Sequence, residues 1–451
     1  MTVTVAGLPF QFAQQNSASG STGFFFKSTK DAYLFNGTAL TLTKVSDVDY
    51  PATTVPGVAY LDGYFFVMDA NGTIYNSDLE APLSWNPLNF INAQAEPDGG
   101  VGIAKYQNYV VGFGNWTTQL FYDAANASGS PLAPLTNATV QIGSANGYSA
   151  AQFDGKLVWM GNCREKGRGV YAFLGGIQPE KISTPDVDRI LNADDLATVY
   201  SWGAGFAGHP LYVLSLGTSA VTLVYDFLTG VWSTFTRRKT ASAKTATLSY
   251  DSATGLVTAA STAHGNEDGD QVVIAGATQS QYNGTFNITR TGADSFTYLP
   301  TTAPSVTPAT GTITATGTTE TWFDLTYYAN AGGKDVVLGA TDGIVYEVLG
   351  TAHQDNGVTI DTIARTALFD GGENTRKSVF SAELIGDKVA ANALLRYSDD
   401  DYVTNSIYRP VDLSAKRSRV RRLGSMSRRS FEIRHTANTA LRIESLELNG
   451  D

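Results

Sequence analysis

The chain has 451 residues, including 45 glycines and one cysteine; 11% of its residues are aromatic and only 16% are charged. A single cysteine excludes an intrachain disulfide and any cysteine-based zinc site. Abundant glycine and aromatic residues with few charged ones are typical of short strands and turns, so we predict an all-β fold.

The net charge of −11 is unevenly distributed. Residues 409–434 contain nine Lys and Arg and two acidic residues, a net charge of +7, and the remaining 22 basic and 40 acidic residues amount to −18. Wrapping duplex DNA requires broad neutralisation of phosphates, so this balance disfavours a general DNA-wrapping protein. It favours a protein that keeps nucleic acid off its surface, or one that docks on oppositely charged copies of itself.

Residues 1–20 are predicted to form an N-terminal arm. They lack the basic start and the long apolar stretch of a signal peptide. No window of the chain approaches 18 consecutive apolar residues, so we predict no membrane span and synthesis in the cytoplasm.

A hairpin pattern then recurs along the chain: an apolar strand, a Gly/Asn/Asp turn and a strand with a tyrosine. In "YLDGYFFVMDANGTIYNSD", residues 60–78, the strands are Tyr64–Met68 and Thr73–Tyr75. The tyrosines of the six hairpins lie 42, 47, 49, 54 and 121 residues apart; they are Tyr33, Tyr75, Tyr122, Tyr171, Tyr225 and Tyr346. A period of 40 to 50 residues with strands in each unit predicts a β-propeller of about six blades, residues 21–240 and 318–352.

The long fifth interval contains a Thr-, Ala-, Ser- and Gly-rich block with strands and turns of its own, residues 241–317. Removing its 77 residues shortens the interval to 44, so we predict an inserted small β domain on a blade loop. Residues 353–451 read as further strands, which form a C-terminal β subdomain or close the propeller ring. One helix is expected at "TPDVDRILNADDLATVY", where Thr184-Pro185 starts it.

The residues offer little for catalysis or cofactor binding. His209, His264, His353 and His435 are far apart, and Cys163 has no base partner in the sequence. The G-x-G-x-x-G match "GAGFAG" precedes Pro210 and a strand rather than a helix, so we interpret it as a blade-to-blade loop.

Neither a calcium-binding loop nor a phosphate-binding loop is supported by the sequence. Asp399, Asp400 and Asp401 lack the Gly and the distant Glu of a calcium loop, which favours a structural turn. "GGKD" at Gly332 lacks the Ser/Thr and the spacing of a P-loop. We therefore predict no catalytic residue, no metal ligand and no cofactor.

In the basic segment, Arg417, Arg419 and Arg421 alternate with Val420 at strand spacing and share one face. A solvated face, a subunit interface with an acidic partner surface and a DNA contact are all compatible with this pattern. The suspected interface residues are Arg417, Arg419, Arg421 and Arg422.

Several stretches, in this order, resemble the packaged-DNA stabilisation or tail hub (nozzle) proteins of short-tailed bacteriophages. They are "NAQAEPDGGVGIAKYQNYVVGFGNWTTQLFYD" (92–123), "QIGSANGYSAAQFDGKLVWMG" (141–161), "IQPEKISTPDVDRIL" (177–191), "LRYSDDD" (395–401) and "RVRRLGSMSRRSFEIRHTANTALRIESLELNG" (419–450). The chain departs from the family pattern in its inserted block and in its short polar N-terminus.

The resemblance implies a non-enzymatic virion protein of the phage tail that forms a homo-oligomeric ring, expected to be a hexamer. Such a ring attaches below the portal and adaptor, retains packaged DNA and forms the ejection channel. Its implied partners are copies of itself, portal or adaptor proteins, tail fibre, tailspike or tail needle proteins, and genomic DNA in the channel. The alternative is a propeller glycosidase or a host-carbohydrate-binding tail protein.

Overall fold

The computed structural model describes residues 11–16, 22–93, 95–136, 138–206, 208–323, 325–331, 334–340, 344–349, 351–373 and 375–450. The chain divides into two compact units. The first comprises Met1–Phe235 and Trp322–Val348, and the second comprises Thr236–Thr321 and Leu349–Asp451. We call the first the propeller unit.

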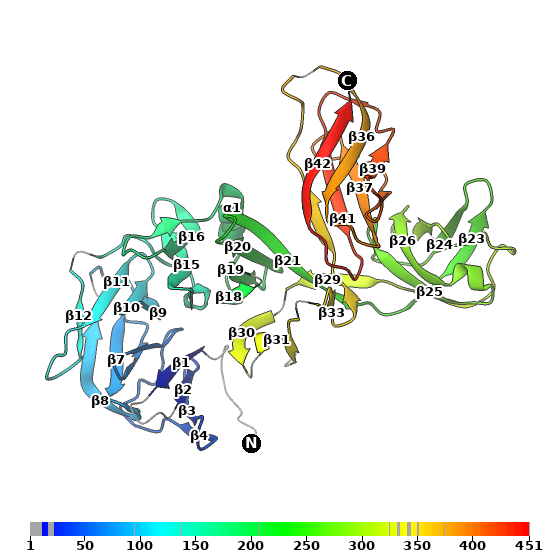
Figure 1. Ribbon diagram of the computed structural model, residues 1–451. Coiled ribbons are helices and arrows are strands. Elements are labelled where there is room, and N and C mark those ends of the chain that lie inside the picture. The colour runs from blue at the N-terminus through cyan, green and yellow to red at the C-terminus, as the bar shows by residue number, and fades with distance from the viewer. Residues whose placement is uncertain are drawn as a thin grey trace. The chain divides into compact units, whose positions relative to one another are not determined.

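The described part of the propeller unit contains six antiparallel sheets that follow one another around a ring, from β1–β4 in blue to β30 and β31 in yellow (Figure 1). The first three sheets are β1 (Gln11–Asn16), β2 (Thr22–Lys27), β3 (Ala32–Asn36) and β4 (Thr41–Lys44); β5 (Ala59–Leu61), β6 (Tyr64–Met68), β7 (Thr73–Asp78) and β8 (Ala81–Asn92); and β9 (Gly100–Tyr106), β10 (Tyr109–Gly114), β11 (Thr118–Asp123) and β12 (Leu132–Pro134).

The other three sheets are β13 (Gly143–Ser144), β14 (Ala151–Phe153), β15 (Lys156–Cys163), β16 (Gly167–Phe173) and β17 (Glu180–Lys181); β18 (Val199–Phe206), β19 (His209–Leu216), β20 (Val221–Asp226), β21 (Val231–Thr240) and β29 (Thr318–Trp322); and β30 (Leu325–Ala331), β31 (Lys334–Ala340) and β32 (Val345–Glu347). The predicted β-propeller is confirmed. Each repeat tyrosine lies on the third strand along its sheet: β3, β7, β11, β16, β20 or β32.

The repeated apolar strand pairs with the tyrosine strand of its sheet, and on β6, β10 and β15 both of its faces are buried. On β6, Phe65 and Val67 pack in the core shared with the first blade. Phe66 and Met68 pack in the core shared with the third blade. Because side chains alternate across a strand, a strand between two sheets must be apolar at every position, and this explains the run "YFFVM".

The same division continues along the ring. On β10, Val110 faces the second blade, whereas Val111 and Phe113 face the fourth. On β15, Trp159 faces the third blade and Met160 faces the fifth. The propeller unit is therefore held together by cores between successive blades, and no blade in this series completes its core alone.

The second unit contains two sets of sheets. Residues 241–317, which we call the insert module, form a sheet in the order β22-β28-β25-β26-β27-β24-β23. Its strands are β22 (Lys244–Thr245), β23 (Thr247–Asp251), β24 (Leu256–Ala260), β25 (Gln271–Ala277), β26 (Gly284–Arg290), β27 (Ser295–Tyr298) and β28 (Gly311–Thr316). Val257, Val272, Phe286 and Phe296 are among the residues of a core that lies within the insert module.

Residues 354–450 begin with the hairpin β33 (Gln354–Asp355) and β34 (Val358–Thr359), and the rest form two sheets that we call the C-terminal sandwich. One sheet has the order β35-β41-β37-β38, and in the other β36 pairs with β39, β40 and β42. The strands are β35 (Thr362–Arg365), β36 (Lys377–Gly386), β37 (Asn392–Ser398), β38 (Arg409–Asp412), β39 (Ser418–Arg421), β40 (Ser425–Met426), β41 (Ser430–His435) and β42 (Ile443–Gly450). Leu384, Leu395 and Phe431 belong to the core between the sheets.

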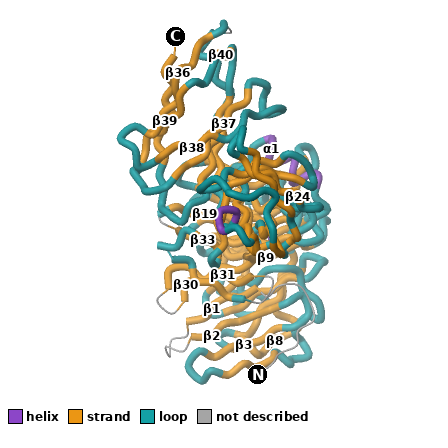
Figure 2. Tube along the Cα trace, turned by 90° about the vertical axis from the view of Figure 1, so that its right-hand side faces the viewer, coloured by secondary structure: helices purple, strands orange, loops and turns teal. Residues whose placement is uncertain are grey.

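Strands dominate the trace, and helical segments are short (Figure 2). The helix α1 (Pro185–Ala193) begins where expected, with the Thr184 hydroxyl accepting a hydrogen bond from the Val187 N–H at 3.5 Å. Two short 3₁₀ turns lie at Gly147–Ser149 and Ser280–Tyr282. None of the helices in the described ranges has the length and apolarity needed to cross a membrane.

The structure differs from the expected organisation at three points. Gln11–Asn16, expected in the arm, pair with Thr22–Lys27 in the first blade. Thr318–Trp322, expected in the last blade, pair with β21 of the fifth. The "GAGFAG" segment begins within strand β18 and leads into the hairpin turn to β19, so its interpretation as a blade-to-blade loop was wrong. Gly332, in the "GGKD" stretch, lies outside the described residues.

Candidate functional site

The basic segment 409–434 spans strands β38 to β41 of the C-terminal sandwich. Its nine positive charges differ in burial: Lys416, Arg417 and Arg428 are exposed and Arg409 is half-buried. Arg429 and Arg434 are buried, whereas Arg421 and Arg422 are exposed and Arg419 is half-buried. Only charges that are not already neutralised within the chain are available to a partner.

Strand β39 carries two of the arginines that are not buried. Ser418 and Val420 are buried, so Arg419 and Arg421 lie on the opposite face, directly across from Glu383 and Ser381 of β36. Arg422 follows with a left-handed backbone (φ 58°), and its N–H donates to the Phe380 carbonyl at 2.8 Å. The structure thus brings Arg419, Arg421 and Arg422 together, and we call them the β39 arginines.

Arg417 differs from the β39 arginines because its charge is used within the chain. Its Nη2 lies 2.5 Å from Glu383 Oε2. Its Nε donates to both carboxylate oxygens, at 3.0 and 2.8 Å. The hydrogen bonds from Arg417 hold the pKa of Glu383 below its ordinary value of 4.5. Within the described part of the chain, none of the β39 arginines forms an ion pair with a carboxylate.

The acidic run Asp399–Asp401 is held by side chains and turns. Arg429 binds Asp399 through two hydrogen bonds, Nε–Oδ1 at 2.6 Å and Nη2–Oδ2 at 2.8 Å. Asp400 accepts from the backbone N–H and hydroxyl of Thr404, which lower its pKa. Asp401 pairs with Arg428 at 3.1 Å. Among the described residues no group of three or more His, Cys, Asp or Glu has the geometry to hold a metal ion.

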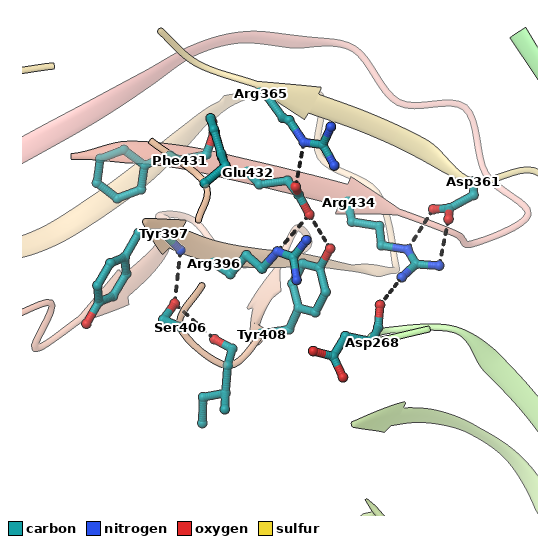
Figure 3. A network of polar contacts seen from close by, with 12 residues as sticks. Asp268, Asp361, Arg365, Arg396, Tyr397, Ser406, Tyr408, Phe431, Glu432 and Arg434 are labelled. Carbon is teal, nitrogen blue, oxygen red and sulfur yellow. Dashed lines mark hydrogen bonds and ion pairs between the residues drawn. The ribbon is translucent and has the colours of Figure 1, made fainter. Parts of the chain in front are cut away.

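A buried polar network occupies the β41 side of the sandwich (Figure 3). Glu432 is fully buried and pairs with Arg365 at 2.7 Å and Arg396 at 2.8 Å, and it accepts a short hydrogen bond from the Tyr408 hydroxyl. Burial alone would raise the pKa of Glu432, but these hydrogen bonds outweigh burial and lower it. A buried carboxylate is stable only when its oxygens are satisfied in this way.

Arg434 extends this network to the insert module. Its side chain is 3% exposed, and its Nη2 lies 2.6 Å from Asp361 and 2.7 Å from Asp270, both equally buried. The carbonyl of Asp268 accepts a further short hydrogen bond from Nη1. Burial would lower the pKa of Arg434, but the hydrogen bonds and charges of Asp361 and Asp270 raise it instead. Arg434 is therefore a charged clamp between the C-terminal sandwich and the insert module.

The four histidines and the cysteine were expected to be far apart, but the structure brings His353 near His435: burial and then the charge of His353 lower the pKa of His435. His209 bonds to Asp226 at 2.8 Å, and His264 contacts the Gly292 carbonyl at 3.0 Å. His435 lies 3.2 Å from the Thr439 hydroxyl. Cys163 ends strand β15 and is half-exposed.

Sequence reasoning missed the role of the carboxylates in "EPDGG". Asp98 accepts hydrogen bonds from the Trp116 N–H at 2.6 Å and from the N–H and hydroxyl of Thr117, both at 2.9 Å. It thereby fixes the turn between β10 and β11. Glu96 pairs with Arg164 of the next blade at 3.2 Å. The sequence feature that could have indicated this role is the acidic residue Asp98 directly before the pair Gly99-Gly100.

The chain is similar in sequence to known bacteriophage proteins. The family model described as "Bacteriophage P22 Gp10, beta-propeller" matches residues 11–257. A curated relative, "Tail hub protein gp10" of Salmonella phage P22, is 25% identical over 205 residues. That alignment covers 43% of each chain, so it spans less than half the length of the relative.

The solved structures that match are distant. A chain of "Crystal Structure of Mitotic Checkpoint Complex" is 13% identical with a TM-score of 0.36, covering 73% of this chain and 86% of that one. "Kluyveromyces lactis Hsv2 complete loop 6CD" is 10% identical with a TM-score of 0.31, covering 57% and 72%. Scores this low add nothing to the fold assignment. The family match covers more than half of the 451 residues and names the fold that the structure shows, so the chain belongs to the family of the bacteriophage P22 Gp10 β-propeller.

Proposed function

We propose that the chain is a structural protein of a short-tailed phage virion and forms the tail hub, or nozzle, of the tail. The observation that carries this proposal is the family match over the propeller blades, together with a curated relative named a tail hub protein. In this role the protein assembles into a ring, expected to be a hexamer, below the portal and adaptor. The ring retains packaged DNA, forms the ejection channel and contacts tail fibre, tailspike or tail needle proteins.

The blade packing supports a mechanical role. Strands β6, β10 and β15 are each buried on both faces between neighbouring sheets, so their blades cannot move without disrupting two cores. Protein interiors packed in this way resist deformation. A ring built from such units is suited to holding a pressurised DNA column, and we propose a non-catalytic role for the same reason.

The β39 arginines are the proposed contact with a neighbouring copy or with the adaptor. Arg421 and Arg422 form no ion pair in the described chain, and Arg419 shares the charge of Glu383 with Arg417, on a protein of net charge −11. Arginine pairs with carboxylates through two parallel hydrogen bonds, which gives geometric specificity that lysine lacks. An acidic partner surface fits this patch better than DNA, because duplex binding needs broader phosphate neutralisation.

The experiment replaces Arg421 and Arg422 with Glu and Arg419 with Gln in the full chain, because Arg419 lies directly across from Glu383 and a carboxylate there would repel it. Arg417 is left unchanged, since a second carboxylate beside Glu383 would destabilise the sandwich for internal reasons. We expect the triple variant to stay folded and to lose ring formation in analytical ultracentrifugation and attachment to portal-bearing heads in electron microscopy.

The matched control is Arg189→Glu, Arg290→Glu and Arg442→Gln, which changes the net charge by the same amount at exposed sites. This control should assemble like the wild-type chain. Assembly of the β39 variant at wild-type affinity would show that this face is only solvated. Hydrolysis of a polysaccharide that a single carboxylate substitution abolishes would contradict the non-catalytic role.

A further inference from the structure

A groove of about 580 Å³ lies between the insert module and the C-terminal sandwich, within the second unit. Strands β24, β26 and β27 of the insert module line one side, and β37, β38 and the loop after β41 line the other. This volume falls in the range of ligand-binding pockets, about 300–1,000 Å³.

The groove is built by specific contacts and is not an accidental gap. The Arg434 clamp joins its two walls through Asp270 and the Asp268 carbonyl. Gly269 has a left-handed backbone (φ 80°), which few other residues adopt, and a β-carbon at this position would lie 2.9 Å from the Tyr408 ring. Gln271 at the base accepts from the Thr359 hydroxyl at 3.2 Å. Both walls are thus held in a fixed relation.

The lining is uncharged. It contains no Asp, Glu, Lys, Arg or His in the described chain; its polar groups are the amides of Gln271, Asn287 and Asn392 and the hydroxyls of neighbouring threonines. The side chains of Asn287 and Asn392 make no hydrogen bond within the described residues, so they are free for a ligand. Leu299 and Ile407 form an apolar rim and are 67% and 71% exposed.

The uncharged lining of the groove favours a neutral ligand over a charged one. A charged ligand finds no counter-ion in the groove, and burying its charge there would be costly. An extended peptide requires an open strand edge for backbone pairing. The lining strands β26, β27 and β37 are paired on both sides, and the edge strand β38 contributes Pro410, which has no N–H to donate.

We propose that this groove binds a neutral oligosaccharide, with the amides of Asn287 and Asn392 hydrogen-bonding its hydroxyls and the apolar rim contacting the C–H faces of its rings. The proposal goes beyond the hub role and does not depend on it. It assigns a binding function to the insert module, which is the part of the chain that departs most from the family pattern.

The test uses the full chain and three neutral probes, maltohexaose, cellohexaose and hexa-N-acetylchitohexaose, titrated by isothermal calorimetry and by ligand-observed NMR. We expect at least one to bind with a Kd of about 1 mM or tighter. The double variant Asn287→Ala and Asn392→Ala should weaken that binding at least about ten-fold, because two hydrogen bonds are lost. Neither residue bonds within the described chain, so the thermal transition should not change.

The control variant is Asn449→Ala, an exposed asparagine on β42 outside the groove, which should bind like the wild-type chain. Three outcomes overturn the proposal: no binding of any probe at about 10 mM, equal binding by the double variant, or stronger, salt-sensitive binding of a heparin hexasaccharide. The last result would assign the groove to an anionic ligand instead.

Discussion

Replacing Arg434 with Met should destabilise the second unit strongly. The substitution leaves the carboxylates of Asp270 and Asp361, 4% and 3% exposed, without the guanidinium that both of them contact. Removing one partner of a buried ion pair typically costs about 3–5 kcal/mol, because the remaining charge stays buried and uncompensated. A typical domain has a stability of about 5–15 kcal/mol, so this is a large fraction of the total.

The assay must report on the second unit alone, since a chain of two units does not unfold in a single two-state step. All six tryptophans lie outside residues 241–317 and 354–450, so intrinsic fluorescence monitors the propeller unit. Hydrogen exchange followed by mass spectrometry monitors β35, β37 and β41. We expect amide protection there to fall by roughly 10²- to 10⁴-fold, while the fluorescence transition stays in place.

A compensating variant separates the loss of the pair from the loss of packing. Changing Arg434 to Met and both Asp270 and Asp361 to Leu removes all three charges, and apolar replacements of buried ion pairs are often neutral or stabilising. We expect protection within about ten-fold of the wild-type chain, that is, within ~1.4 kcal/mol. The reasoning is refuted if Arg434→Met alone leaves protection unchanged.

Four further predictions concern other parts of the molecule. Burial lowers the pKa of Lys27 from 10.5 to about 7. Between pH 7 and 10.5 the unfolded chain therefore binds a proton at Lys27 that the folded chain lacks. The free energy of unfolding of the first blade should rise with pH across this range. Lys27→Met should abolish this rise and add about 1–4 kcal/mol at neutral pH, measured by fluorescence-detected denaturation. Because the pKa of Glu432 is lowered, its contribution to stability is present above pH 4.5 and is lost as the pH falls further. Glu432→Gln should therefore reduce the pH dependence of hydrogen exchange in β41 on the acid side. An unchanged pH dependence would contradict this assignment. Asp98→Ala removes three hydrogen bonds and should cost the propeller unit about 1.5–3 kcal/mol in urea denaturation, with Asn86→Ala as a control. Excision of residues 241–317 should leave the unfolding transition of the propeller unit unchanged. It should reduce the amide protection of β41, because Arg434 loses its contacts to the insert module. Loss of cooperative propeller unfolding would show that the block is not an independent insertion.

The strands of the propeller could be predicted from the sequence because their burial is local and periodic. Tyr64–Met68 is apolar at every position since both faces of β6 are covered, and Gly72, with φ 83°, supplies the turn that follows. The same logic placed each repeat tyrosine on the strand that follows a turn, which the structure shows to be the third strand of its sheet. These features depend on side-chain alternation and turn chemistry, which neighbouring residues determine by themselves.

The charge pairings were decided by the tertiary structure alone. Arg417 and Arg419 look equivalent in the sequence, yet Arg417 binds Glu383, which lies 34 residues away. Arg434 reaches Asp270 across 164 residues. Ion pairs depend on where distant strands meet, and local spacing carries no information about a partner so far along the chain. The alternation of apolar and polar residues therefore determined the blade strands and the exposed face of β39. Long-range strand pairing decided which arginines are available to a partner, and where the insert module and the C-terminal sandwich enclose a groove.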